Sequence, residues 1–343
     1  MIKKSAILLS ITISTAVVIG LALFIRSSDN STVDDKNLPT TEKVSSTIAN
    51  NDASIAAPSQ VQEVVPGPAA TVAQYLPDNL TLKSANSHPL LTSGTSLKVV
   101  NRPLKNLRKL IESDEQGGFL NPIYSPDGLQ IMLTRTGYQG IYLVPSSGGI
   151  PEKICDDNAY FAKWTPEGLI EVRNTENELR LYDLDGTLLS TGTFDPKQEA
   201  AFTDNDVIYM HSKNGEAPKA ITDSNDRYIA PTPAPDGDAV VYMGMYSGLY
   251  YADPNNLSEP IFLGSGGSNV QWTNQGNGFL FEQSRDDGHT YVESDIYYFD
   301  IASGEKQNLT SEFNGVGLNP TIGPNGTSVA FEVDGAIYHG EIP

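Results

Sequence analysis

Short runs of β-forming residues recur from about residue 96 to the C-terminus, and no stretch shows the 3.6-residue period of an amphipathic helix. One set of runs, alternating or rich in Val, Ile, Phe and Tyr, lies at residues 129–133, 169–172, 207–210, 239–242, 279–282 and 328–332. A second set follows in most units, at residues 140–144, 179–182, 248–251, 295–299 and 336–339. Runs of this length and composition predict strands, so we expect an all-β domain.

A turn signal precedes each run of the first set. Its first copy reads Ser125-Pro126-Asp127-Gly128, the glycine recurs at positions 168, 237, 276 and 326, and Asp206 occupies that position in a degenerate sixth copy. Ser or Thr starts such a turn, Pro presets its second position, Asp or Asn suits the third, and Gly supplies a positive φ. Each copy therefore predicts a tight turn between two antiparallel strands.

The spacing of the turns predicts the architecture. Successive copies are 40, 38, 31, 39 and 50 residues apart. A repeat of about 40 residues with four short strands is typical of a β-propeller blade. We expect six blades, the third with three strands because its repeat is short. Five blades, if that unit is not a blade, or seven remain alternatives.

The ring also needs a closing strand. The last unit ends at Pro343 after its third strand, and residues 104–111 precede the first turn with the composition of the missing fourth. We expect this N-terminal strand to complete the last blade, which removes two sheet edges that would otherwise invite aggregation.

The repeat carries a family resemblance over residues 120–343. The Pro-x-aromatic-Ser-Pro-Asp-Gly turn, followed by a β-run and an Ile-Tyr strand, resembles the repeat of TolB-like propellers. It is also similar to the propeller domains of prolyl-oligopeptidase-type proteins. The resemblance implies the propeller fold. It leaves the function open, because families with this repeat include periplasmic scaffolds, substrate-screening domains of hydrolases and polysaccharide-degrading enzymes.

The N-terminal part differs in composition from the repeats. Lys3 and Lys4 precede 21 uncharged residues, 5–25, and Arg26 follows them, which predicts a membrane anchor over residues 1–26. Residues 27–95 are rich in Ser, Thr, Asn and Pro and predict a disordered linker. The propeller, residues 96–343, is then expected in the periplasm or extracellular space. A cleaved signal peptide, which would release a secreted propeller, is the alternative.

The charge limits the classes of partner, and the cysteine and histidine content limits disulfides and metal sites. The three cations of the first 26 residues leave 19 basic against 42 acidic residues, a formal charge of −23. Such a domain repels phosphate backbones, so we expect no nucleic-acid partner and favour a protein or peptide, including a basic one. Cys155 is the single cysteine, which excludes an intramolecular disulfide. The four scattered histidines lack zinc-ligand spacing, and we expect no cofactor, no metal and a monomeric propeller.

Candidate binding residues lie in loops predicted to share one face of the ring, namely the blade-to-blade loops and the long second-to-third loop 284–293. Clustered carboxylates there would receive Lys or Arg side chains from a partner, or chelate a hard cation. The alternative is that these acids are ordinary turn residues that raise solubility. The candidates are Asp114, Glu115, Asp156, Asp157, Asp195, Asp223, Asp226, Asp286, Asp287 and His289.

The aromatic residues before the turns are expected to pack between blades rather than to bind sugar. They occupy one equivalent position, at Tyr124, Trp164, Phe202 and Trp272. We assign no catalytic residue, because the Gly-x-Ser-x-Gly pattern of serine hydrolases does not occur.

The sequence thus favours a membrane-tethered, non-enzymatic propeller that binds a protein or peptide at an acidic mouth. Two alternatives from other classes stay open. One is an enzyme acting on polysaccharide, as a hydrolase or lyase, through a pair of carboxylates at the same mouth. The other is a cation-sensing ectodomain.

Overall fold

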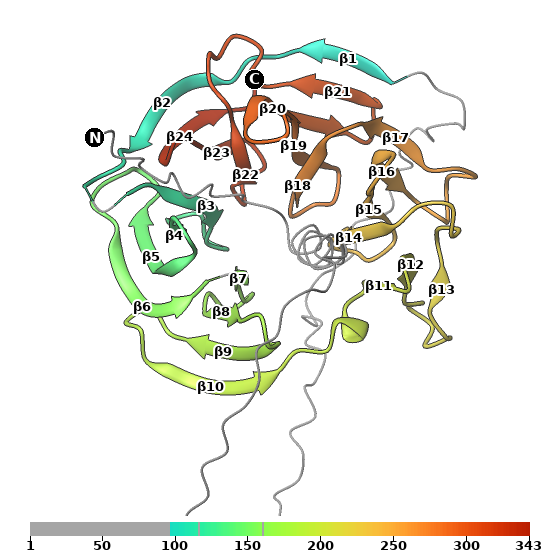
Figure 1. The fold of residues 1–343 in the computed structure, drawn as a ribbon, viewed down its shortest axis with the longest axis horizontal. Coiled ribbons are helices and arrows are strands. Elements are labelled where there is room, and N and C mark those ends of the chain that lie inside the picture. The colour runs from blue at the N-terminus through green and yellow to red at the C-terminus, as the bar shows by residue number, and fades with distance from the viewer. Residues whose placement is uncertain (1–96, 116, 160) are drawn as a thin grey trace, which may run out of the picture. The chain divides into compact units, whose positions relative to one another are not determined.

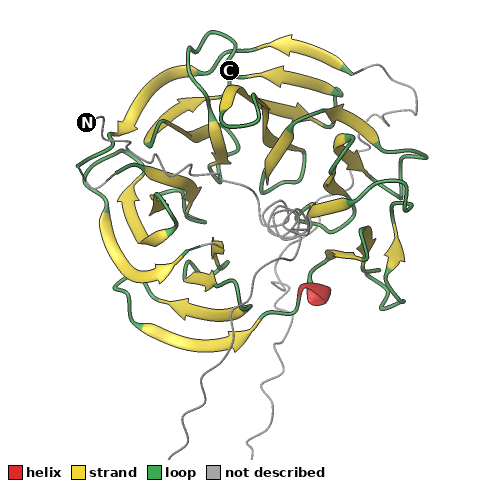
Figure 2. Ribbon diagram, viewed as in Figure 1, coloured by secondary structure: helices red, strands yellow, loops and turns green. Residues whose placement is uncertain are grey.

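The computed structural model describes residues 97–115, 117–159 and 161–343 (Figure 1). The anchor predicted for residues 1–26 and the linker predicted for 27–95 lie outside the described residues. Within the described ranges, no helix is both long and apolar enough to span a bilayer. Strands account for nearly all regular structure there, and the helical element is one 3₁₀ turn, η1 (Pro196–Gln198) (Figure 2).

The strands of the described chain form six sheets around a central axis, which confirms the predicted six-bladed β-propeller (Figure 1). Blade 1 consists of β3 (Phe119–Tyr124), β4 (Gln130–Arg135), β5 (Gln139–Pro145) and β6 (Glu152–Asn158). Blade 2 consists of β7 (Phe161–Trp164), β8 (Ile170–Arg173), β9 (Glu178–Tyr182) and β10 (Leu188–Thr193). In each blade the first strand, called the inner strand, lies nearest the axis.

Blade 3 has three strands, as its short repeat predicted. They are β11 (Ala201–Asp204), β12 (Val207–Met210) and β13 (Lys219–Ala220). Blade 4 returns to four strands, β14 (Tyr228–Pro233), β15 (Val240–Gly244), β16 (Gly248–Ala252) and β17 (Ile261–Gly264).

The ring closes between the two ends of the described chain. Blade 6 contains β22 (Leu318–Ile322), β23 (Ser328–Val333) and β24 (Ala336–Glu341). Its fourth strand is β2 (Lys105–Ile111), which pairs antiparallel with β24. The prediction that residues 104–111 complete the last blade is confirmed, with a start one residue later.

Blade 5 carries a strand that the sequence did not predict. Its four regular strands are β18 (Gly267–Trp272), β19 (Gly278–Asp286), β20 (Tyr291–Asp300) and β21 (Glu305–Asn308). A fifth, β1 (Lys98–Asn101), pairs in parallel with β21 at the rim. Glu305 anchors it, since this carboxylate binds both Lys98 and, at 3.1 Å, Arg102. Two consecutive segments, β1 and β2, therefore fasten two neighbouring blades.

The repeated turns adopt the predicted geometry. The glycine at their fourth position has a positive φ in all five full copies, for example 73° at Gly128 and 74° at Gly326. In the first copy the Gly128 N–H donates to the Ser125 carbonyl oxygen at 2.9 Å, and Asp127 accepts from the Ser125 hydroxyl at 2.6 Å. In the degenerate copy, which lies in blade 3, Asn205 and Asp206 take positive φ values of 49° and 63° instead. Asn and Asp tolerate this region better than most residues.

Two of the four aromatics predicted to pack between blades also form hydrogen bonds across the junction. The Trp164 indole N–H donates to the Ile123 carbonyl of blade 1 at 3.1 Å. The Trp272 indole N–H donates to the Thr232 carbonyl of blade 4 at 3.0 Å. Tyr124 belongs to a buried cluster shared with blade 6. Phe202 is the exception, since its ring contacts come from Tyr209 and His211 of its own blade.

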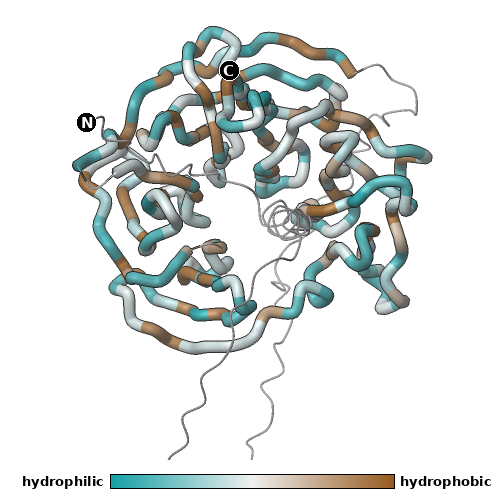
Figure 3. The backbone as a smooth tube through the Cα atoms, in the orientation of Figure 1, coloured by the Kyte–Doolittle hydropathy of each residue, from teal (hydrophilic) through white to brown (hydrophobic). Residues whose placement is uncertain are grey.

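Buried hydrophobic clusters hold neighbouring blades together. Among the described residues they join blades 6 and 1, 5 and 6, 4 and 5, 1 and 2, and 3 and 4. The junction of blades 2 and 3 has no such cluster. Figure 3 shows hydrophobic and hydrophilic stretches alternating along the chain in every blade. The ring therefore has one junction that apolar packing does not fill.

Antiparallel pairing assigns each connection to a face of the ring. The turns between first and second strands and between third and fourth strands lie on one side, called the turn face. The loops between second and third strands and between blades lie on the other, called the mouth face. The sequence prediction that the candidate loops share a face follows from this topology.

The closing strand predicts a stability effect. Ile111 is 5% exposed and packs in the cluster between blades 6 and 1. We expect Ile111→Ala to lower the free energy of unfolding by about 2–5 kcal/mol, because it removes buried methyl groups and leaves a cavity. Lys105→Ala, at an exposed position of the same strand, should change it by less than about 0.5 kcal/mol. Urea unfolding, followed by circular dichroism, measures the stability of both variants. Equal unfolding midpoints for Ile111→Ala and Lys105→Ala would show that the packing of β2 does not stabilise the closed ring.

Candidate functional site

A central cavity of ≈1080 Å³ lies where the inner strands of all six blades meet. Its wall combines inner-strand residues with residues of mouth-face loops from blades 1 and 2 and of the connection to blade 3, such as Tyr138, Asn177 and Phe194. The five full copies of the repeated turn contribute no residue to it, and the degenerate copy contributes Thr203. The cavity is therefore associated with the face that carries the predicted candidate residues.

Four of the six inner strands have the same bulge at the cavity wall. The pairing register of β3, β14, β18 and β22 shifts at this point, and one residue takes a φ between 50° and 52°. That residue is Asn in three blades and Ala in the fourth: Asn121, Ala230, Asn269 and Asn319. A bulge takes backbone groups out of the sheet ladder, so these groups need other hydrogen-bond partners.

Two buried glutamates accept hydrogen bonds from these bulges. Glu282 of blade 5 accepts from the Asn319 backbone N–H of blade 6 at 2.6 Å, and from the Ser268 hydroxyl at 3.0 Å. Glu332 of blade 6 accepts from the Asn319 side-chain amide at 2.8 Å and from a backbone N–H of Asn121 in blade 1. Each carboxyl group thus links its own blade to the next blade of the ring.

Burial changes the protonation of both groups. Desolvation is the largest cause and raises the pKa of Glu332 to about 8, against the lowering effect of its hydrogen bond from Asn319. Burial likewise raises the pKa of Glu282. Neither glutamate belongs to the residues that line the cavity. Their position behind the wall suits a role in fixing Asn319 and the neighbouring bulges.

Sequence reasoning missed these two glutamates, although a signal existed. Both occur six residues after the turn glycine, at Gly276 and Gly326, where the equivalent residue of blade 1 is Thr134. Both lie within predicted strands, where a carboxylate is unusual because the position is expected to be buried. Alignment of the repeats at that position would have singled them out.

Asp156 and Asp157 lie on a strand, which corrects the predicted loop. Strand β6 continues to Asn158 because it keeps pairing with β5 as far as Gln139. Alternation along the strand separates the two side chains. That of Asp156 is 91% exposed, pairs with Lys153 and borders a smaller cleft of ≈440 Å³ on blade 1. That of Asp157 is 20% exposed and faces blade 2.

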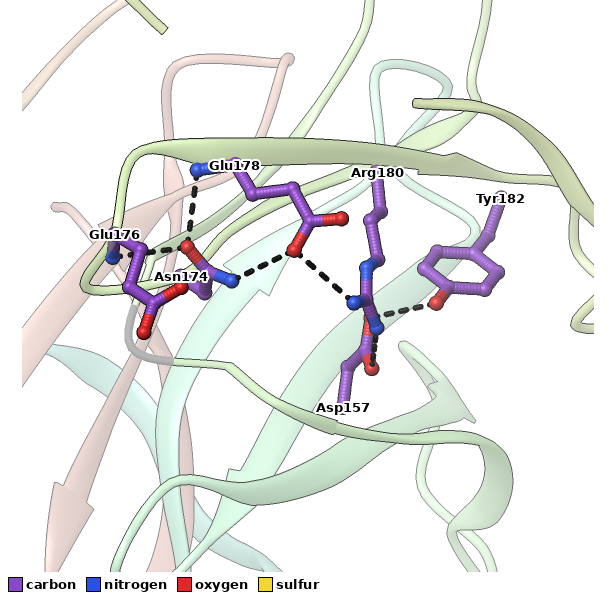
Figure 4. A network of polar contacts seen from close by, with 6 residues as sticks. All are labelled: Asp157, Asn174, Glu176, Glu178, Arg180 and Tyr182. Atoms are coloured by element: carbon purple, nitrogen blue, oxygen red, sulfur yellow. Dashed lines mark hydrogen bonds and ion pairs between the residues drawn. The ribbon is translucent and has the colours of Figure 1, made fainter. Parts of the chain in front are cut away.

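Asp157 belongs to a polar network between blades 1 and 2 (Figure 4). It accepts from the Arg180 guanidinium at 2.7 Å and from the Tyr182 hydroxyl at 2.5 Å. Burial, followed by the bond to Asp157, raises the pKa of Tyr182 to about 12. Glu178 binds Arg180 at 3.1 Å and accepts from Asn174 at 3.0 Å, so the network extends to the β8–β9 loop. Asp157 therefore joins blade 1 to blade 2 through these hydrogen bonds.

Asp195, Asp223 and Asp226 lie in blade-to-blade connections, as predicted, and hold these connections in shape. Asp195 caps η1 by accepting from the Lys197 N–H. Asp223 accepts from the Asn225 N–H at 3.0 Å. Asp226 accepts from Ser247 and from the N–H groups of residues 227, 246 and 247. Burial alone would raise its pKa, but these bonds together lower the pKa below the usual range.

The remaining candidates lie on blades 5 and 1. Asp286 is the last residue of β19 rather than part of a loop, because the β19–β20 ladder extends further than predicted, and the hairpin loop comprises residues 287–290. Asp287 accepts from the N–H groups of His289 and Thr290. Asp114 forms a two-pronged ion pair with Arg135, at 2.6 and 2.7 Å. Glu115 is exposed beside it.

The structure thus brings the candidates to one face without gathering them into one cluster. They are distributed over the loops and strand ends of several blades, and most engage a neighbouring cation, hydroxyl or backbone N–H. In the described part of the chain, no group of three or more His, Cys, Asp or Glu side chains is placed to hold a metal ion.

Comparisons with known proteins find similar solved structures only. No family model matches the chain, and no curated protein matches it. Similar solved structures include an oligogalacturonate lyase from Vibrio parahaemolyticus, with 12% identity, a TM-score of 0.47 and coverage of 71% of this chain and 99% of that chain. A gluconolactonase from Xanthomonas campestris has 10% identity, a TM-score of 0.48 and coverage of 76% and 99%. TolB from Acinetobacter baumannii has 19% identity, a TM-score of 0.38 and coverage of 67% and 65%. These neighbours differ in what they do, and at such identities none assigns an activity to this chain.

The contrast between Asp156 and Asp157 predicts different effects of one substitution. Asp157→Ala should lower the free energy of unfolding by about 1–3 kcal/mol, because it removes the acceptor of the Tyr182 hydroxyl and one of the two carboxylates that bind Arg180. Asp156→Ala, whose side chain is almost fully exposed, should stay within about 0.5 kcal/mol of the parent chain. Thermal unfolding of the two variants side by side tests the assignment. It is wrong if the two substitutions are equivalent.

Glu332 predicts a pH dependence. Its pKa is about 8 in the folded chain and near 4.5 when unfolded, so the folded state holds the extra proton between these values. Its contribution to stability is complete below about pH 4.5 and is lost as the pH rises to about 8. Glu332→Gln, which resembles the protonated acid, should flatten this part of the stability profile and leave stability near pH 5 almost unchanged.

Chemical unfolding at pH 5, 6.5 and 8 measures the profile. The exposed Glu341→Gln serves as the matched control and should keep the parent slope. An unchanged slope in Glu332→Gln would mean that its carboxyl group is ionised in the folded chain.

Proposed function

We propose that this protein is a non-enzymatic binding module that takes an extended segment of a partner protein into its central cavity. The observation that carries the proposal is the cavity of ≈1080 Å³, lined from all six blades. Ligand pockets commonly have about 300–1,000 Å³, so this one has room for several residues of peptide.

The chemistry of the wall supports a peptide. Bulges leave backbone groups outside the sheet ladder, and the residues after three of them are Pro122, Pro231 and Pro320. Proline has no N–H, so its carbonyl oxygen is its only backbone hydrogen-bonding group. An extended peptide offers N–H donors along its length and complements such acceptors, while apolar wall residues such as Val270 contact its side chains.

The acids of the mouth face form the outer part of the proposed site. Glu115 and Asp156 are the exposed members whose substitution disturbs the fold least, and they would attract a basic segment of the partner. We further propose that the chain belongs with the TolB-like propellers and is held outside the cytoplasmic membrane by residues 1–26 and the linker 27–95. The turn repeat and the uncharged stretch 5–25 support these two proposals.

The polysaccharide enzyme is the second candidate, and one observation favours it. Glu282 and Glu332 are buried carboxyl groups with raised pKa values, a property common among catalytic acids. Glycoside cleavage requires two carboxyl groups that reach the substrate from a cleft. Both glutamates lie behind the cavity wall and hold Asn319, which is why we favour binding over catalysis.

A cavity-filling variant tests the proposed function. Gln271 lies on the inner strand of blade 5 and lines the cavity. Crosslinking capture with the full chain, from an extract of the cells that produce it, should yield a partner that Gln271→Trp fails to capture. Gln275→Trp makes the same change at an exposed turn of the same blade, on the opposite face, and should capture the partner normally.

A double charge reversal, Glu115→Lys with Asp156→Lys, tests the acidic part separately. We expect it to weaken capture by tenfold or more at low salt and less at high salt, because exposed charges are screened.

Equal capture by the parent chain and by Gln271→Trp would contradict the use of the cavity.

A further inference from the structure

Arg173 differs from the other charged residues of the cavity wall. It ends β8, where its Cα pairs with that of Phe161 on the inner strand of blade 2. Counted from the repeated turn, Phe161–Arg173 is the fourth residue pair between the first and second strands of blade 2. Thr134, Glu282 and Glu332 hold the corresponding position of the second strand in blades 1, 5 and 6. The two glutamates find donors in the next blade of the ring. Arg173 points to the junction of blades 2 and 3, the one without a buried hydrophobic cluster.

Two aromatic rings fix the guanidinium group. Its central carbon lies 3.9 Å from the ring centre of Phe161 and 3.8 Å from that of Phe194. At these distances the rings cannot share one face of the planar group, so they cover both faces. Such stacking orients the group and leaves its N–H edge as the only direction for hydrogen bonding.

That edge has no acceptor among the described residues. The Arg173 Nε atom is buried without a hydrogen-bond partner, and none of the ion pairs of the described chain includes Arg173. A buried N–H that lacks an acceptor has lost its hydrogen bond to water without gaining one from the protein, which costs free energy. Because Arg173 lines the cavity, a bound ligand can supply the missing acceptor.

The neighbouring charges indicate which anion fits. Lys163 and Glu171, also on the cavity wall, pair with each other at 2.9 Å. Glu199 lines the same cavity, near enough to favour the charged form of Arg173 without forming an ion pair with it. Glu171 acts on Arg173 in the same direction, so two cations and two carboxylates meet here, and this balance disfavours a doubly charged phosphate. A single carboxylate matches the guanidinium edge, with two parallel N–H···O bonds.

We propose that Arg173 recognises a carboxylate of the peptide in the cavity, either the C-terminal group or an Asp or Glu side chain. This inference rests on the proposed function, because it assumes that a peptide enters the cavity. The inference adds a chemical requirement to the proposed function. The bound segment carries one negative charge at the wall formed by blades 2 and 3, even where its other residues are basic.

Two synthetic peptide libraries test the requirement. N-acetylated random hexapeptides with free C-termini, and the same peptides with amidated C-termini, are panned on the immobilised full chain. We expect enrichment of peptides that carry a carboxylate. A preference confined to the free-acid library identifies the C-terminal group, and selection of Asp or Glu in the amidated library identifies a side chain.

The matched variants are Arg173→Met and Arg108→Met. Methionine keeps an unbranched stem between the two rings and removes the charge, so Arg173→Met should bind the selected peptides about tenfold or more weakly, as expected for the loss of a charge-assisted pair. Arg108→Met removes the same charge on the closing strand β2, away from the cavity, and should leave binding unchanged.

A competition with the unmodified chain does not depend on the folding of a variant. N-acetylglycine should displace a selected peptide at concentrations where its amide does not. The role of Arg173 is wrong if peptides bind equally well with and without a carboxylate, and equally well to Arg173→Met. Peptide binding in the cavity still stands in that case if Gln271→Trp abolishes the binding of these peptides. If the parent chain retains no peptide that Gln271→Trp rejects, both proposals fail.

Discussion

The propeller depends on one antiparallel pairing between opposite ends of the described chain, that of β2 with β24. A propeller blade has an exposed edge at the rim, but the inner strands enclose an axis only when the first and last blades meet. Leu110 and Ile111 of β2 enter the cluster that also contains Ile337 of β24 and Phe119 of blade 1. Closure and apolar packing therefore coincide at the same few residues, and the central cavity exists because that junction holds.

Much of the ring could be predicted because its signals are local. A turn with Pro, Asp and Gly at fixed positions prescribes backbone dihedrals whatever surrounds it, and repetition every 40 residues or so multiplies that signal. Strand β1 could not be predicted, since four residues such as Lys98–Asn101 become a strand only when β21 offers a free edge. Asp156 and Asp157 were predicted to lie in a loop for a similar reason: the length of β6 is determined by its partner β5.

The candidate site was predictable only as a face of the ring. Topology determines which loops share a face, whereas the role of each side chain depends on neighbours from distant repeats. Asp157 finds Arg180 and Tyr182 of the next blade, and Glu282 finds the backbone of Asn319. Carboxylates that look available in the sequence are thus engaged in the fold. Arg173, which has no distinguishing feature in the sequence, lies between two rings and has no acceptor at a junction that no buried hydrophobic cluster joins.

The parallel strand β1 has a mechanical consequence. Any pull on the chain N-terminal to Lys98 reaches the propeller at the rim of blade 5, where β1 pairs with β21 and Glu305 holds Lys98 and Arg102. The load must strip this short strand before it acts on β2. Since β2 closes the ring and β1 does not, the first contacts to break under tension are ones that the ring can lose while it stays closed. Under such a load β1 would separate from β21 before β2 separates from β24.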